Sequence, residues 1–145
     1  MNGNENLIPR MTGTLNIALG FTGLVLAALG GLALGMTFDN FAVRNGEHVL
    51  TLGRFFLREG HSHGMPIALY NLIIGLGLQH GWVEGQKAHR VVSIGAAVGF
   101  LLPIGLILRS LVGPNIAPIG MLGALGLLAS FVICLSSAWK RLLSR

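Results

Sequence analysis

The chain has 145 residues, of which 52% are hydrophobic and only 10% are charged, and its formal net charge is +5. A soluble domain usually carries about a quarter charged residues, so this composition excludes a water-facing surface over most of the chain. The ten Lys and Arg residues form no basic helix face, which argues against nucleic acid as a partner. We therefore expect an integral membrane protein whose main partner is the lipid bilayer.

The first predicted element is a membrane-spanning helix over residues 15–38, which follows a short polar tail. This apolar run is longer than the core of a signal peptide, about 7–15 residues, and no small-residue cleavage site follows it. A span needs about 20 apolar residues, so we expect the helix to be retained in the membrane.

A mixed segment of charged and apolar residues, 39–60, precedes the second span. It fits either an interfacial helix or the beginning of a longer second helix. The apolar run that follows, residues 65–78, is short for a span, so we extend the predicted helix to residues 61–79. That extension places two histidines just inside one membrane interface, and an earlier beginning near Leu50 would place them deeper.

Two more spans are predicted over residues 91–108 and 119–139, each preceded by a short loop. Pro118 fits the first turn of the last helix, where a missing N–H costs little. Neither an internal repeat nor a linker divides the chain. The sequence therefore predicts an all-α membrane protein in which residues 1–145 form one domain, a compact bundle of four transmembrane helices.

Glycines recur along these helices at spacings that let helix backbones approach closely. We expect them to pack the helices of one bundle together; the alternative is a homo-oligomer or a place in a larger membrane complex. The glycines concerned are Gly31, Gly35, Gly95, Gly99, Gly120, Gly123 and Gly126.

Four spans place both termini on the same side of the membrane, and basic residues favour the cytoplasmic side. The side with the termini would hold Arg10, Lys87, Arg90, Lys140, Arg141 and Arg145, and the other side Arg44, Arg54, Arg58 and Arg109. This distribution predicts cytoplasmic termini in a bacterial inner (cytoplasmic) membrane.

Two histidines, His61 and His63, stand where the mixed segment meets the second apolar run. Imidazole is costly to place in hydrocarbon and titrates near neutral pH, so the pair is a candidate site for a transition metal or haem. Residues two apart on a regular helix point about 200° away from each other. Both would bind one ion only if Gly60, Gly64 and Pro66 loosen the beginning of the helix. The alternative is an interfacial pair bonded to headgroups or loop carbonyls.

His63 shares a helix face with Tyr70, and Asn71 is only slightly offset from it. This stripe makes His63, Tyr70 and Asn71 the candidate catalytic residues, with His61 the more dispensable histidine. An amide or phenol without a hydrogen-bond partner is costly at mid-bilayer, so Asn71 and Tyr70 should face other helices. Their candidate partners are Asn16, Thr22 and Ser93.

Arg109 closes the third predicted helix at the same membrane face as the histidines. Its guanidinium would either reach up to the interface or bind a haem propionate or an anionic group of a substrate. The sequence carries no phosphate-binding loop, nucleophile elbow, zinc-protease or dinucleotide motif, so it leaves open whether the protein is an enzyme.

The stretch from His63 through residues 75–78 to residues 86–90 resembles hydroxylaminobenzene mutase-type membrane proteins. The resemblance implies a small four-helix protein with His63 as the site histidine and Asn71 as its companion. The acidic residue that follows the family's histidine has no counterpart here, where Gly64 stands instead.

Three functions are therefore expected. The leading hypothesis is a membrane protein that binds a metal or haem at His61 and His63, or that supports membrane redox chemistry. The second is a membrane isomerase or mutase that acts on a small aromatic substrate. The third is a structural subunit of a larger membrane complex.

Overall fold

The computed structural model describes residues 7–37, 43–44, 47–48, 51–113, 115 and 117–144. Most of these residues are helical, which confirms the all-α class. The elements in chain order are α1 (Leu7–Met36), β1 (Val43–Arg44), β2 (Glu47–His48), α3 (Leu52–Gln79), α4 (Gln86–Val98), α5 (Leu101–Val112) and α6 (Ala117–Leu143). The two-residue strands β1 and β2 pair antiparallel.

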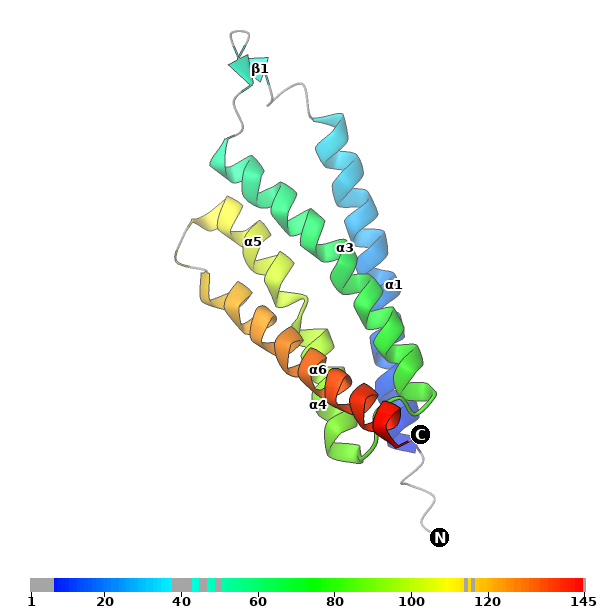
Figure 1. The fold of residues 1–145 in the computed structure, drawn as a ribbon. Coiled ribbons are helices and arrows are strands. Elements are labelled where there is room, and N and C mark those ends of the chain that lie inside the picture. The colour runs from blue at the N-terminus through cyan, green and yellow to red at the C-terminus, as the bar shows by residue number, and fades with distance from the viewer. Residues whose placement is uncertain are drawn as a thin grey trace.

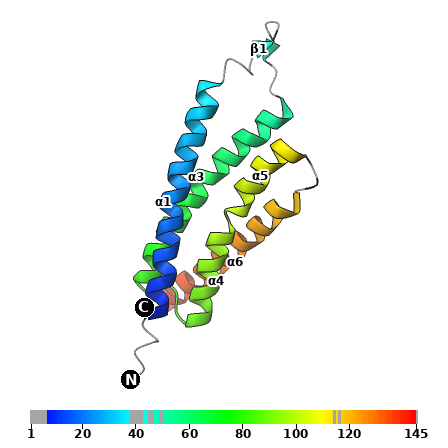
Figure 2. The ribbon, with the colours of Figure 1, turned by 180° about the vertical axis from the view of Figure 1, so that it is seen from behind.

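The helices form one elongated bundle (Figure 1). α1 packs along α3 and touches α4, whereas α5 packs against α3 and α6. α3 thus lies between α1 and α5, as the view from behind also shows (Figure 2). The first turns of α1 and the last turns of α6 lie at the same end of the bundle. Below, the end with α4 is called the α4 half and the opposite end the α5 half.

The second predicted helix begins about nine residues earlier than expected, at Leu52 rather than at residue 61. Thr51 caps it, because its Oγ1 accepts a hydrogen bond of 3.3 Å from the Arg54 backbone N–H. The end of the mixed segment is therefore helical, and the histidines lie well inside α3. This is the longer second helix that the composition left open.

The third predicted helix is divided into α4 and α5, with Gly99 and Phe100 between them. Pro103 has no N–H for the Gly99 carbonyl, and its ring crowds that carbonyl. The Leu102 N–H bonds to the Gly99 oxygen instead, at 3.0 Å, and Phe100 N–H bonds to Ala97 at 3.2 Å. The proline thus ends one helix and begins another with a change of direction.

Three segments among the described residues are long and apolar enough to cross a membrane: Gly13–Met36, Gln86–Val112 and Pro118–Leu143. The broken helix α4–α5 counts as one such segment. α3 has 28 residues, which is about 42 Å of helix, but its charged and imidazole side chains make it less apolar.

The apolar core lies in the α4 half, where α3, α4 and α6 meet around Ile74, Leu78, Val83, Val92 and Ala96. Glycines bring the helices together there, as the sequence predicts. A Cβ on Gly75 would lie 2.6 Å from the Gly13 oxygen of α1, and one on Gly95 would lie 2.5 Å from the Gly126 oxygen of α6. Gly35, by contrast, has open space around it.

Candidate functional site

A groove of about 910 Å³ lies between α1, α3 and α5. It arises because α1 and α5 lie on opposite sides of α3, whereas α1 and α4 are in contact. Its walls are almost entirely apolar, and small residues on α1 and α3 leave room for it. The wall includes Gly23, Gly30, Gly60, Gly64, Phe100 and Pro103.

His61 lines this groove from α3. Its ring lies against Gly31 of α1, so closely that a Cβ on that glycine would be 2.7 Å from the imidazole Cε1. The Nδ1 atom is buried and has no hydrogen-bond partner among the residues that the structure describes. A buried polar atom without a partner is costly, and a polar ligand atom that reached the imidazole would remove that cost.

Arg54 lines one end of the groove. It lies about two turns before His61 on α3 and is only 8% exposed. Its guanidinium donates to the Thr37 hydroxyl at 3.0 Å and to the Leu34 carbonyl at 2.5 Å, at the C-terminal end of α1. A cation there complements the partial negative charge of the helix end. Arg54 thus ties α3 to α1 and closes this end of the groove.

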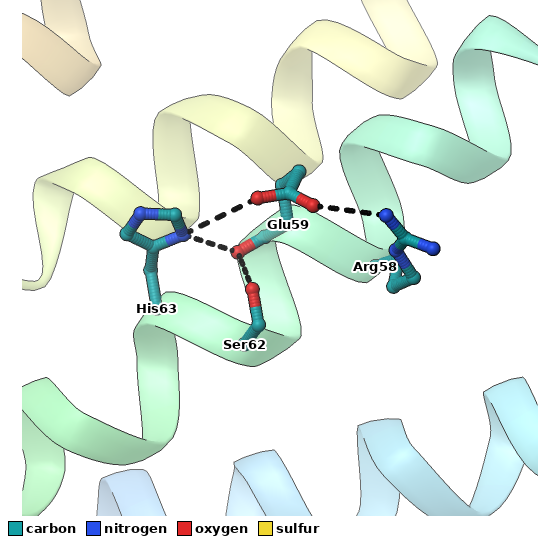
Figure 3. Close-up of polar contacts among 4 residues, drawn as sticks. All are labelled: Arg58, Glu59, Ser62 and His63. Carbon is teal, nitrogen blue, oxygen red and sulfur yellow. Dashed lines mark hydrogen bonds and ion pairs between the residues drawn. The ribbon is translucent and has the colours of Figure 1, made fainter.

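His63 lies beside Glu59 on α3 (Figure 3), and because it stands two residues from His61 on a regular helix, it lies on another face. Its Nδ1 is 2.8 Å from the Glu59 carbonyl oxygen, to which it donates, and 3.9 Å from the Glu59 carboxylate. The side chain is 48% exposed. Because α3 is regular here, the two imidazoles diverge, and the loosened backbone that would unite them is absent between Gly60 and Gly64.

A metal centre with several protein ligands has no counterpart in the described part of the chain. No three His, Cys, Asp or Glu side chains come together there. A single imidazole, that of His61, is instead presented to the groove. This arrangement suits one hydrogen bond or one coordinate bond to a ligand.

Asn71 is fully buried and hydrogen-bonded at both ends of its amide. Its Oδ1 accepts from Asn16 of α1 at 2.8 Å, and its Nδ2 donates to the carbonyls of Ala96 at 2.8 Å and Ile67 at 3.0 Å. Asn16 also bonds with Ser93 of α4. The predicted partners Asn16 and Ser93 are therefore confirmed, and the amide joins three helices.

Tyr70 points to α6 rather than to the groove. Its hydroxyl lies 2.6 Å from the Ser130 Oγ, which donates to the Val92 carbonyl at 3.0 Å. Its ring meets that of Phe131 edge to face at 4.5 Å, and the Cys134 sulfur lies 3.9 Å from its hydroxyl. The structure thus places His63, Tyr70 and Asn71 in three different surroundings.

Arg109 lies in the last turn of α5, with its guanidinium 4.6 Å from the centre of the Phe56 ring on α3. It is not among the residues that line the groove. Its position fits a cation–π contact near the polar end of the helix. Thr22, the third predicted partner of the buried polar residues, lines the groove instead.

Two features of the site are not predicted by the sequence: the hydrogen bond of Ser130 and the groove wall at Phe100 and Pro103. Ser130 gave no signal, because isolated serines are common in membrane helices. The groove wall at Phe100 and Pro103 is apolar and depends on how α5 leaves α4. Pro103, which can break a helix, is the one sequence signal near this wall.

Comparison of the chain with known protein families, with curated proteins and with solved structures finds no match. The likeness to hydroxylaminobenzene mutases is therefore neither supported nor refuted, and the function has to be inferred from the site.

Proposed function

We propose that the protein is an integral membrane protein with four spans, the fourth being α3. Three segments have the length and composition of spans, and α3 packs along two of them. Of its buried polar residues, Asn71 is hydrogen-bonded to α1 and α4 and Arg54 to the end of α1, which lowers the cost of polar groups in a bilayer. The basic residues near α1 and α6 favour cytoplasmic termini in a bacterial inner membrane.

Within this membrane protein, the groove is the binding site of an apolar molecule that carries an oxygen atom, as quinones and long-chain alcohols do. The observation that carries this proposal is the imidazole of His61, which lines an almost entirely apolar wall and whose buried Nδ1 has no hydrogen-bond partner among the described residues. Ligand sites are mostly apolar clefts of about 300–1,000 Å³ with a few polar groups that fix the ligand's orientation. The groove and its single imidazole match that description.

Binding is favoured over catalysis by the composition of the wall. The ionisable groups among the described lining residues are His61 and Arg54, and Arg54 is engaged by the end of α1. No carboxylate stands in the described wall to act with the imidazole as an acid–base pair. A mutase acting on a small aromatic substrate would have to work with one imidazole alone.

Haem is the second candidate ligand. A haem iron takes an axial imidazole, and a haem is flat and largely apolar. His61 is among the residues that line the groove, whereas His63 is not. Arg109 lies over Phe56 and does not line the groove, so Arg54 would be the described lining cation that could face the propionates.

An absorption spectrum of the protein purified from its membrane, followed by solvent extraction and mass spectrometry, separates these ligands. A haem gives a Soret band, whereas a quinone or alcohol is recovered by extraction at near-stoichiometric amount. His61→Ala should lose the ligand and His63→Ala, the matched control two residues away, should keep it. Equal retention in both variants, or no enriched apolar molecule in the wild type, would contradict the proposal.

A further inference from the structure

One face of α3 carries polar side chains that are partly or largely exposed in the described structure. Arg58, Glu59, Ser62 and His63 lie side by side there, as Figure 3 shows. The Arg58 and Glu59 side chains are 3.4 Å apart and are 59% and 27% exposed, and that of His63 is 48% exposed. We call these four residues the α3 polar face.

The α3 polar face begins near the membrane interface and reaches into the bilayer. A Cβ on Gly64 would lie 3.8 Å from the Pro103 Cβ, so His63 is at the depth of Pro103 on α5. Arg109, near the polar end of α5, is six residues further along (109 − 103), or about 9 Å away. His63 therefore lies about 9 Å below the level of Arg109, within the apolar span Gln86–Val112.

Polar groups at the depth of His63 rarely face lipid, because hydrocarbon offers them no hydrogen bond; Arg58 and Glu59 lie about one turn nearer the interface. The contact between Arg58 and Glu59 satisfies only part of their charge, and His63 donates one hydrogen bond to a backbone carbonyl of its own helix. The remaining surface of this face needs a partner that supplies both acids and bases at the same depth.

We propose that the α3 polar face is the contact surface with a second copy of this chain, related by a two-fold axis normal to the membrane. Such an axis places α3 of both copies side by side and parallel, with equal residues at equal depth. Glu59 of one copy then meets Arg58 of the other at nearly the same level, and the reverse pair forms as well. His63 lies one turn, about 6 Å, below this double pair.

The charges of the face favour a second copy over lipid headgroups. An anionic headgroup would attract Arg58 but would be repelled by Glu59, whereas the face is complementary to itself. The inference uses the span of α3 that the proposed function assigns. It does not depend on what the groove binds, since none of the four residues of the α3 polar face lines the groove.

Disulfide cross-linking in the native membrane tests this directly. In a Cys134→Ser background, which removes the single native cysteine, Ser62→Cys places a thiol on the α3 polar face. Leu32→Cys is the matched control, because it lies beside Gly31, which packs on His61, and is 61% exposed on α1. Oxidation should cross-link Ser62→Cys into a dimer several times more than Leu32→Cys. Equal cross-linking of the two would overturn the proposal.

Charge exchange tests the pairing itself. Glu59→Lys gives two facing cations and Arg58→Glu two facing anions, so each variant alone should lose most of its self-association, measured by energy transfer between labelled copies in vesicles. A mixture of the two variants should regain it, because opposite charges then face each other. Self-association of either variant at the wild-type level, or a mixture as weak as the separate variants, would contradict a two-fold contact through this face.

Discussion

The α4 half and the α5 half of the bundle are built from the same long helices, α1 and α3, but they differ in how those helices are used. In the α4 half, Asn16, Asn71 and Ser93 join α1, α3 and α4, and Gly75 brings two backbones into contact. In the α5 half, α5 has turned away from the direction of α4 at Pro103, and a groove opens between α1 and α5. The contacts of the α4 half hold the helices together, whereas the α5 half contains the groove.

The largest loss of stability is expected from a substitution in the α4 half that separates α1 from α3. Gly75→Ala places a Cβ 2.6 Å from the Gly13 oxygen and 2.8 Å from the Ile17 nitrogen, so a backbone has to move. We expect a loss of about 1–3 kcal/mol in the free energy of unfolding, measured by titration with denaturing detergent. Gly35→Ala, the control on α1, meets no atom within 4 Å and should raise it by at most about 1 kcal/mol. Equal effects would refute this contact.

A smaller loss is expected from the buried amide. Asn71→Leu keeps the approximate volume but leaves the Ala96 carbonyl and one bond of the Asn16 amide without their partner. The free energy of unfolding should fall by about 1–2 kcal/mol, since hydrogen bonds between membrane helices are worth about 0.6 kcal/mol on average and at most about 1.7. Ser62→Ala, which removes a bond within its own helix on the exposed face, should change it little. An unchanged stability for Asn71→Leu would contradict a structural role.

The tyrosine contact should matter less. Tyr70→Phe removes one hydrogen bond to Ser130, which keeps its bond to the Val92 carbonyl, and it preserves the edge-to-face contact with Phe131. The same titration should show a loss of about 0.5 kcal/mol. Binding of a ligand in the groove should be unaffected. A selective loss of binding or turnover with intact stability would instead support the catalytic role that the sequence suggested.

The α5 half should tolerate a bulky side chain with almost no loss of stability. Ala33→Phe adds a ring to the groove wall, whereas Ala28→Phe adds the same ring to an exposed position of α1 that is not part of the wall. Both should change the free energy of unfolding by less than about 0.5 kcal/mol. Only Ala33→Phe should abolish ligand retention, measured by extraction and mass spectrometry. Retention in Ala33→Phe would mean that the ligand lies elsewhere.

The α4 half was largely predictable from the sequence, because a buried polar side chain between apolar helices must find a hydrogen-bond partner. Asn71 in an apolar run needs a partner, and Asn16 and Ser93 were the nearest polar groups on other helices. The divergence of His61 and His63 also follows from helix geometry once α3 is regular. What the sequence left open was where α3 begins, since the cap at Thr51 stands in a segment of mixed composition.

The groove of the α5 half could not be predicted from the sequence, because it depends on how the helices pack in the tertiary structure. Pro103 signals a break, but the direction in which α5 leaves α4 depends on its contacts with α3 and α6. The contact of the His61 ring with α1 likewise depends on Gly31, which is remote from His61 in the sequence. For this reason the sequence favoured His63 as the site histidine, whereas the structure presents His61 to the groove.

Photolabelling tests the central claim, that the α5 half binds an apolar ligand through His61, most directly. The purified protein is irradiated in vesicles with a long-chain alcohol that carries a diazirine, and the labelled peptides are mapped by mass spectrometry. We predict label concentrated on the groove wall around Phe100 and Ile104, lost in His61→Ala and kept in His63→Ala. Label spread evenly over all lipid-facing positions, or unchanged in His61→Ala, would contradict the claim.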